Sequence, residues 1–243
     1  MDYDRLAFDC IERLERVRTP GAISDELFRV IPDFGFHCFC ISGMPDPGES
    51  MGDYVLLNGW PEGWLERYVA HGYVHVDPVI RLLKSTTVPF CWADAPYDRD
   101  GEPEAHRVMT EAVEFRMRAG LTVPIFSVSG FQAGVTFGSE HKLDLSERAR
   151  AALHLIAIYA HNAARDGLSA TGNRASKRSK QLSPRQAEIL RWIAAGKTNW
   201  EIGCILSISE RTVEHQARAA AHRLNAVTRA QAVAEAMRAR LIH

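Results

Sequence analysis

The chain has 243 residues, of which 46% are hydrophobic and 24% are charged, as in a globular protein long enough for two domains. No apolar run approaches the roughly 18 residues of a membrane span, and the acidic N-terminus lacks the pattern of a secretion signal. Its five cysteines are an odd number, which argues against a disulfide framework. We therefore expect a cytoplasmic protein that does not span a membrane.

Charge is divided unevenly along the chain. Residues 1–173 hold 16 basic and 25 acidic residues, a net charge of −9, whereas residues 174–243 hold 13 basic and 5 acidic residues, a net charge of +8. A basic segment joined to an acidic one is typical of a protein that binds nucleic acid through one part only.

The first two thirds of the chain mix helical and strand patterns. Apolar residues at helical spacing predict a helix over 3–18, and Ser24 is an acceptable N-cap for a second helix that ends before Gly35. The other predicted elements are strands at 36–43, 53–58, 121–128 and 133–139 and helices at 61–71, 78–85, 103–118 and 145–165. Because the last two strands are separated by the short segment 129–132, they should pair as an antiparallel hairpin. We expect an α/β (α+β) fold class, with residues 1–165 as an α-β-α sensor domain of the GAF/PAS kind around an antiparallel sheet.

Residues 166–181 lack apolar periodicity and are predicted to be a linker. From 182 to 243 the pattern is entirely helical, which predicts a second, all-α domain of four helices. Ser183, Ser209 and Thr228 are its expected N-caps, and Asn199–Leu206 is its short second helix. Two short helices joined by a three-residue turn have helix-turn-helix geometry, in which the second helix enters the major groove of DNA.

Metal and catalytic sites are not expected. Cys38 and Cys40 lie beside His37 in a predicted strand, and no second Cys/His pair completes a tetrahedral site. His71 and His75 precede Asp77, but no downstream histidine completes a metallohydrolase motif. The sequence also has no Gly-rich phosphate loop and no nucleophile elbow. We therefore predict neither catalytic residues, nor metal ligands, nor a cofactor.

The C-terminal domain closely resembles the LuxR-type helix-turn-helix. The matching segments are Leu182–Leu190, Ala195–Thr198, Glu201–Ile202, Ile205–Ser209, Thr212–Val213 and Arg223–Asn225. The resemblance implies a homodimer on a two-fold-symmetric operator in double-stranded DNA, dimerised partly through its last helix, with RNA polymerase as a further partner. The residues it places at the DNA are Lys197, Thr198, Ser209, Arg211, Thr212, Glu214, His215 and Arg218.

The N-terminal domain resembles the autoinducer-binding domain of quorum-sensing regulators. The resemblance is carried by Trp60, Trp64–Tyr68, Asp77–Val79, Trp92, Gly120–Pro124 and Thr136. It implies an N-acyl-homoserine lactone as ligand, with Trp64 donating to the lactone carbonyl, Asp77 accepting from the amide N–H and Thr136 donating to the amide carbonyl. The ligand-binding residues implied in this way are Trp60, Trp64, Tyr68, Asp77, Val79, Trp92 and Thr136. Taken singly, these residues also fit a plain core and an ordinary helix cap.

Several positions depart from the family pattern. Trp60 stands where many relatives have tyrosine, and Gln186 stands where the family has glutamate, which predicts a weaker contact within the DNA-binding domain. Gln216 and Ala219 replace the usual residues of the recognition helix. Two alternatives therefore stay open: a solo regulator that answers a non-lactone signal, and an antagonist that sequesters related regulators as heterodimers.

Overall fold

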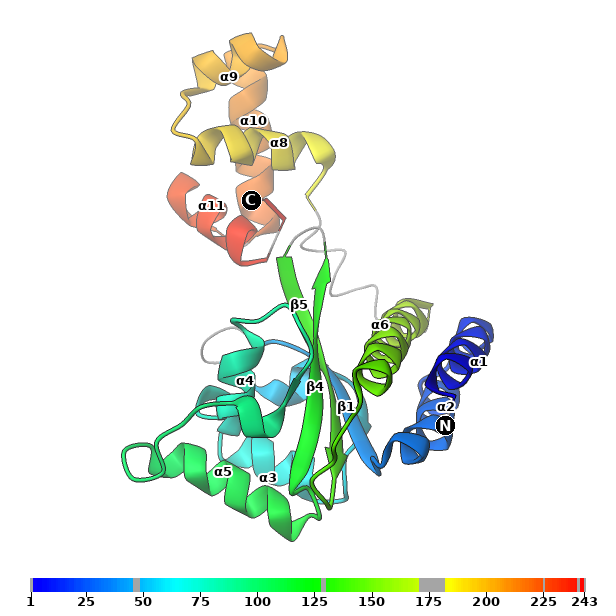
Figure 1. The fold of residues 1–243 in the computed structure, drawn as a ribbon. Helices are drawn as coiled ribbons and strands as arrows, with labels where there is room; N and C mark the ends of the chain where they lie inside the picture. The colour runs from blue at the N-terminus through cyan, green and yellow to red at the C-terminus, as the bar shows by residue number, and fades with distance from the viewer. Residues whose placement is uncertain are drawn as a thin grey trace. The chain divides into compact units, whose positions relative to one another are not determined.

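The computed structural model describes residues 2–45, 49–127, 130–170, 182–224, 226–239 and 241–242. The chain divides into two units, Met1–Thr171 and Gly172–His243, each with its own core (Figure 1). Among the described residues, no helix is long and apolar enough to cross a lipid bilayer.

A five-stranded antiparallel sheet forms the centre of the first unit, with strand order β2-β1-β5-β4-β3. The predicted hairpin is present, because β4 pairs antiparallel with β5 from Ala119↔Ser139 to Ser127↔Gly130. The strands are β1 (Cys38–Gly43), β2 (Val55–Gly59), β3 (Phe90–Cys91), β4 (Ala119–Ser127) and β5 (Gly130–Ser139).

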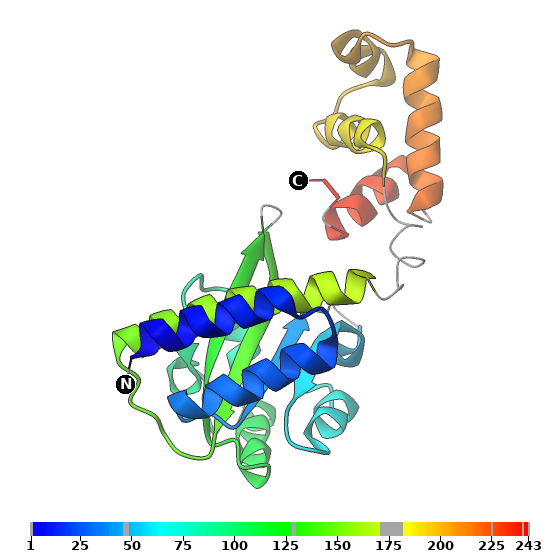
Figure 2. The same cartoon turned by 90° about the vertical axis from the view of Figure 1, so that its right-hand side faces the viewer.

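One face of this sheet is covered by three helices that lie side by side, α1 (Tyr3–Arg16), α2 (Pro20–Val30) and α6 (Glu147–Ala170) (Figure 2). Their buried side chains, such as Leu14, Leu27 and Leu153, pack against Phe39 and Ile41 of β1 in one continuous core. Each such side chain contributes roughly 1.5–3 kcal/mol when it is withdrawn from water.

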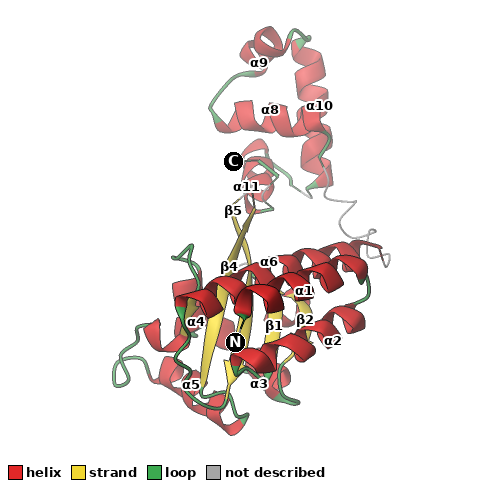
Figure 3. Cartoon of the chain, turned by 45° about the vertical axis from the view of Figure 1, so that its right-hand side comes forward, coloured by secondary structure: helices red, strands yellow, loops and turns green. Residues whose placement is uncertain are grey.

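The opposite face carries α3 (Trp64–Ala70), α4 (Pro78–Leu83) and α5 (Pro103–Glu114), so the unit has the expected α-β-α layers (Figure 3). Because side chains alternate along a strand, Cys40 and Ser42 of β1 point to this side, away from Phe39 and Ile41. Four 3₁₀ turns complete the unit at Ile31–Phe34, Met51–Tyr54, Tyr73–His75 and Trp92–Asp94.

Two of the helix boundaries that differ from the prediction have an identifiable local cause. Helix α2 begins at Pro20 rather than near Ser24, since Thr19 caps it with a side-chain oxygen 3.3 Å from the backbone nitrogen of Ala22 and proline suits the first helical turn. Helix α5 ends at Glu114, before the predicted residue 118, because Arg116 has a left-handed φ of 62°.

The C-terminal end of α6 shows tertiary packing overriding local sequence. The prediction ends this helix at 165 and begins a linker at 166, but α6 continues to Ala170. Gly167 lies against the end of α1, so that a Cβ atom there would be 2.6 Å from the carbonyl oxygen of Arg18. The glycine inside this helix therefore allows α6 to pack closely on the segment that follows α1. The rest of the predicted linker, residues 171–181, lies outside the described residues.

The hairpin and the edge strand also differ in detail. The predicted turn at 129–132 is wrong, because Gly130–Ser139 already belongs to β5. The edge strand β3 is not predicted, since two residues are too few to show a strand period.

The described part of the second unit contains the four expected helices, α8 (Pro184–Ala194), α9 (Asn199–Leu206), α10 (Glu210–Arg223) and α11 (Arg229–Arg238). Ser183, Thr198, Ser209 and Thr228 each cap the helix that follows with a side-chain oxygen. Ile189, Ile202 and Val213 bring α8, α9 and α10 together in a buried cluster.

Gly120 offers a test of how tightly the sheet packs on the face that carries α3, α4 and α5. A Cβ atom at this position would lie 2.2 Å from Cε2 of Trp92 and 2.5 Å from the carbonyl oxygen of Phe137. We expect Gly120→Ala to lower the free energy of unfolding by about 2–3 kcal/mol, measured by urea unfolding followed by circular dichroism. Gly21→Ala is the matched control, because that glycine has no heavy atom within 4 Å of the added carbon. A neutral Gly120→Ala would contradict this packing.

Candidate functional site: an apolar cavity and a helix-turn-helix

A cavity lies between the sheet and the three helices of the second face. About 550 Å³ between its walls is not filled by protein atoms, a figure that also counts any space open to solvent. The residues that line it are Cys40, Ser42, Met51, Trp60, Trp64, Tyr68, Asp77, Val79, Ile80, Leu83, Trp92, Val108, Met109, Ala112, Met117, Gly134 and Thr136.

All seven residues that the sequence places in a ligand site line this one cavity. They come from segments far apart in the chain. Trp64 and Tyr68 project from α3, and Asp77 and Val79 lie at the N-terminal end of α4. The remaining three, Trp60, Trp92 and Thr136, lie before α3, after β3 and on β5.

Asp77 is the buried carboxylate of the cavity, and both of its oxygens accept hydrogen bonds. The hydroxyl of Tyr68 donates to Oδ2 at 2.8 Å, and the backbone N–H of Val79 donates to Oδ1 at 2.7 Å. Asp77 is therefore the N-cap of α4, as its position before Pro78 suggests, and it also faces the cavity. Burial raises the pKa of Asp77, and burial together with the nearby carboxylate raises the pKa of Tyr68.

A hydrogen-bonded chain crosses the sheet side of the cavity. The indole N–H of Trp92 donates to the hydroxyl of Thr122 at 3.1 Å, and the hydroxyls of Thr122 and Thr136 lie 3.2 Å apart. Thr122 is fully buried on β4, directly opposite Thr136 in the strand register. The chain fixes the side chains of Trp92 and Thr136, and it leaves the cavity with a small number of polar groups in set positions.

Aromatic rings form the wall around α3. Trp60 lies 5.5 Å from Tyr68 and 6.5 Å from Trp64, measured between ring centroids. The indole nitrogen of Trp60 is buried, and within the described part of the chain it has no hydrogen-bond partner. A buried donor without an acceptor costs about 1–3 kcal/mol. A ligand that brings an acceptor to the indole N–H of Trp60 would therefore bind more tightly.

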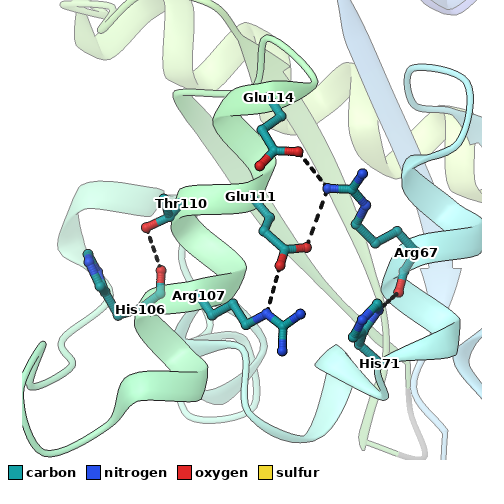
Figure 4. A network of polar contacts seen from close by, with 7 residues as sticks. All are labelled: Arg67, His71, His106, Arg107, Thr110, Glu111 and Glu114. Atoms are coloured by element: carbon teal, nitrogen blue, oxygen red, sulfur yellow. Dashed lines mark hydrogen bonds and ion pairs between the residues drawn. The ribbon is translucent and has the colours of Figure 1, made fainter.

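An ionic network connects α3 with α5 on the outer side of the cavity wall (Figure 4). Arg67 of α3 lies 2.6 Å from a carboxylate oxygen of Glu114 and 3.5 Å from one of Glu111. Glu111 is also bound by Arg107 at 2.7 Å. The hydrogen bond from Arg107 lowers the pKa of Glu111, which keeps that carboxylate charged near neutral pH.

The second unit holds the residues expected at DNA. Lys197 and Thr198 lie at the start of α9, where Glu201 accepts from the backbone of Thr198 at 2.8 Å and from Lys197 at 3.1 Å. These hydrogen bonds lower the pKa of Glu201 to about 2, and the bond from the backbone of Thr198 has the largest effect. Ser209 caps α10, whose exposed residues include Arg211, Thr212, Glu214, His215 and Arg218.

The turn between α9 and α10 is compact. Ser207 ends α9 with a left-handed φ of 53°, and a Cβ atom on Gly203 would lie 2.8 Å from the carbonyl oxygen of Ile208. The guanidinium of Arg185 on α8 donates to the carbonyl oxygen of Leu206 at 2.8 Å, which satisfies one of the last carbonyls of α9. The two helices of the motif are thus held at a fixed angle.

Gln186, which stands where the family has glutamate, makes a reciprocal contact at the start of α8. Its side chain is buried, and the side-chain oxygen accepts from the backbone N–H of Ser183 at 3.0 Å. The backbone N–H of Gln186 in turn donates to the hydroxyl of Ser183 at 3.2 Å. This reciprocal pair is a capping box, which glutamine forms as well as glutamate does.

The two units match two known families. Residues 19–164 match the family described as autoinducer binding domain, and residues 180–236 match the family described as bacterial regulatory proteins, luxR family. The first match alone covers more than half of the chain. The chain belongs to the LuxR family of autoinducer-binding transcription regulators.

Two relatives are similar to the chain over nearly its whole length. The transcriptional activator protein BjaR1 of Bradyrhizobium diazoefficiens is 40% identical over 243 residues, covering 100% of this chain and 98% of the relative. The quorum sensing-dependent transcriptional regulator RpaR of Rhodopseudomonas palustris is 40% identical over 240 residues, covering 99% and 96%.

Solved structures agree on the fold. Escherichia coli SdiA superposes with a TM-score of 0.70 at 20% identity over 97% of both chains. The N-acylhomoserine lactone dependent factor CepR2 of Burkholderia cenocepacia superposes with a TM-score of 0.53 at 25% identity, covering 70% of this chain and 99% of that chain. As a member of this family, the chain is a ligand-responsive, DNA-binding regulator of quorum sensing, and its relatives are transcription regulators rather than enzymes.

Sequence reasoning missed Thr122, which supports two lining residues, and several of the lining residues themselves. Thr122 is part of the Gly120–Pro124 segment that carries the resemblance, yet its fully buried hydroxyl between Trp92 and Thr136 has no signal of its own in one sequence. The methionines and aliphatic residues of the lining look like ordinary core residues in the sequence. Among the described residues, no group of three or more His, Cys, Asp or Glu side chains is placed to hold a metal ion.

Thr122 provides the test of the polar chain. We expect Thr122→Val to lower the free energy of unfolding by about 1–3 kcal/mol, because the buried indole N–H of Trp92 then lacks an acceptor, whereas Thr122→Ser should retain most of the stability. Thr110→Val is the control, because the exposed Thr110 bonds only within α5, to the carbonyl of His106 at 2.9 Å. Equal stabilities of the two valine variants in chemical unfolding would contradict the role of Thr122.

Proposed function

We propose that the cavity binds an N-acyl-homoserine lactone. In this proposal the indole N–H of Trp64 donates to the lactone carbonyl, Asp77 accepts from the amide N–H, and Thr136 donates to the amide carbonyl. The rings of Trp60, Tyr68 and Trp92, together with Val79, then surround the acyl chain. The lining of this cavity by all seven residues supports the assignment, as does the name of the structural relative CepR2.

The position of Asp77 is the observation that carries this proposal. A carboxylate among apolar and aromatic side chains is costly unless its lone pairs are used. Tyr68 and Val79 each use one lone pair of a different oxygen, and the backbone of Ile80 is a further donor to the carboxylate. A carboxylate has about four acceptor sites, so capacity for another donor is left. An amide N–H is a donor that fits this position, and charge assistance makes such a bond stronger than a neutral one.

Ligand binding is proposed to act through dimerisation and DNA. A ligand that completes the cavity core stabilises the binding-competent form by mass action. The exposed apolar residues Phe8 on α1, Leu155 and Tyr159 on α6 and Met237 on α11 support a homodimer. The dimer would bind half-sites about one helical turn, roughly 10 bp, apart. RNA polymerase is the proposed further partner, and the cytoplasm, where this DNA lies, is the proposed location.

A thermal-shift panel tests the ligand. Homoserine lactones with straight, branched and aryl acyl groups are added to the purified protein, and its Tm is measured. We expect one class to raise Tm by about 5–10 °C at a hundred times its Kd, and Asp77→Asn to lose this shift, because asparagine retains the helix cap but presents an amide N–H to the ligand amide.

Asp2→Asn is the matched control for this panel. Asp2 is also the N-cap aspartate of a helix, since it accepts from the backbone of Arg5 at 3.2 Å at the start of α1, away from the cavity. Its variant should keep the full shift. If no lactone shifts a folded, DNA-binding protein, the ligand is not a lactone and the solo-regulator alternative replaces this proposal.

One observation favours that alternative. The buried indole N–H of Trp60 has no partner among the described residues, and a lactone whose three polar groups are already assigned brings no further acceptor to it unless the acyl chain carries one. The panel therefore includes 3-oxo and 3-hydroxy lactones, as well as acyl glycerols that lack the lactone ring. A shift with the glycerols alone would identify a non-lactone receptor.

DNA binding is tested through α10. We expect Arg211→Ala to weaken binding about tenfold or more to DNA selected from a random pool by the wild-type protein, and to reduce the slope of affinity against salt concentration by about one unit if it contacts phosphate. Arg191→Ala, which removes an exposed arginine from α8, is the control. If wild-type protein binds no selected DNA with or without ligand in a gel-shift titration, the antagonist alternative is favoured instead.

A further inference from the structure

Helices α3 and α5 face each other across the cavity. Trp64 and Tyr68 line it from α3, and Val108, Met109 and Ala112 line it from α5. The inner faces of both helices therefore contribute walls, and any molecule that passes between these helices enters the cavity directly.

The outer sides of the same two helices are joined by charge. Arg67 spans the gap to Glu111 and Glu114 (Figure 4). Its guanidinium carbon lies 4.7 Å from the ring centroid of Phe115. The Phe115 ring in turn lies 5.2 Å from the ring of Trp64. Arg67 thus closes the gap between α3 and α5, here called the seam, on its outer side. Through Phe115 it is in contact with Trp64 of the cavity wall.

The other walls are fastened differently. The sheet is a continuous hydrogen-bonded ladder, and α4 is tied to α3 by the buried bond from Tyr68 to Asp77. Leu83 of α4 packs so closely on β5 that a Cβ atom at Gly134 would lie 2.7 Å from it. In contrast, the seam between α3 and α5 is joined by ion pairs between side chains: Arg67 is 35% exposed, Glu114 is 60% exposed and Glu111 is 16% exposed. The more exposed of these pairs, Arg67–Glu114, breaks at low cost.

We propose that the seam between α3 and α5 is the entrance of the cavity, and that the Arg67–Glu111–Glu114 network is the latch that keeps it closed. The side chain of Glu111 is only 16% exposed and is held by two arginines, so this carboxylate is the central member of the latch. The latch sets how fast a small apolar molecule enters and leaves. Its relevance to signalling rests on the cavity being the ligand site.

Two native cysteines report the opening without any ligand. Cys40 lines the cavity, whereas Cys10 lies in the core on the other face of the sheet, and both are buried. N-ethylmaleimide therefore reaches Cys40 when the cavity opens, and it reaches Cys10 only when the opposite core unfolds. Mass spectrometry of peptides from the full-length protein gives the two labelling rates separately, and fragment spectra distinguish Cys40 from Cys38.

We expect Glu111→Gln, which retains the shape but removes the charge, to raise the labelling rate of Cys40 about threefold or more and to leave that of Cys10 unchanged. Glu140→Gln is the matched control, because it breaks an ion pair of 2.6 Å with Arg116 away from the cavity. Glu102→Gln tests the rival seam, where Arg81 joins α4 to the start of α5.

The proposal is overturned if Glu111→Gln leaves the labelling rate of Cys40 unchanged, whether or not Glu102→Gln raises it. It is also overturned if Glu111→Gln raises the labelling rate of Cys10 as much as that of Cys40. A lactone that stabilises the wild type extends the test, because Glu111→Gln should then speed its association and its dissociation alike and change Kd little. If no lactone binds, the proposed ligand fails, while the labelling rates still decide whether the seam is the entrance.

Discussion

The hydrogen bond between Tyr68 and Asp77 is the constraint on which the cavity depends. It joins α3 to the first turn of α4 inside an aromatic environment, where an unpaired carboxylate would be destabilising. Because Asp77 also caps α4, the position of that helix and the position of the acceptor are fixed together. A residue that looks like an ordinary helix cap is therefore also a buried polar residue of the cavity wall.

The two faces of the sheet differ in how their side chains pack. On one side, Phe39 and Ile41 pack in a filled core beneath α1, α2 and α6. On the other, the strands present small or polar residues, including Cys40, Ser42 and Gly134, and these leave the space that the helices enclose. The layer of α3, α4 and α5 has a hydrophobic cluster of its own, which surrounds the cavity.

The amphipathic helices and the capped helices of the second unit are predictable from sequence, because periodicity and N-cap residues are local signals. The seven lining residues that the sequence places in a ligand site are predictable through their spacing and the family resemblance. The continuation of α6 past Gly167 is not, since it depends on contact with the end of α1. Nor are the Arg67–Glu111 bridge and the burial of Thr122, because each is created by segments that only the fold brings together.

Gln186 has a consequence for measurements on DNA. Its capping box holds the start of α8 through a neutral amide, so neither salt nor a change of pH through the range of carboxylates weakens it. The helix that supports α9 and α10 therefore retains its first turn across the ionic strengths used in binding titrations. Loosening of this turn then makes no contribution to the dependence of DNA affinity on salt.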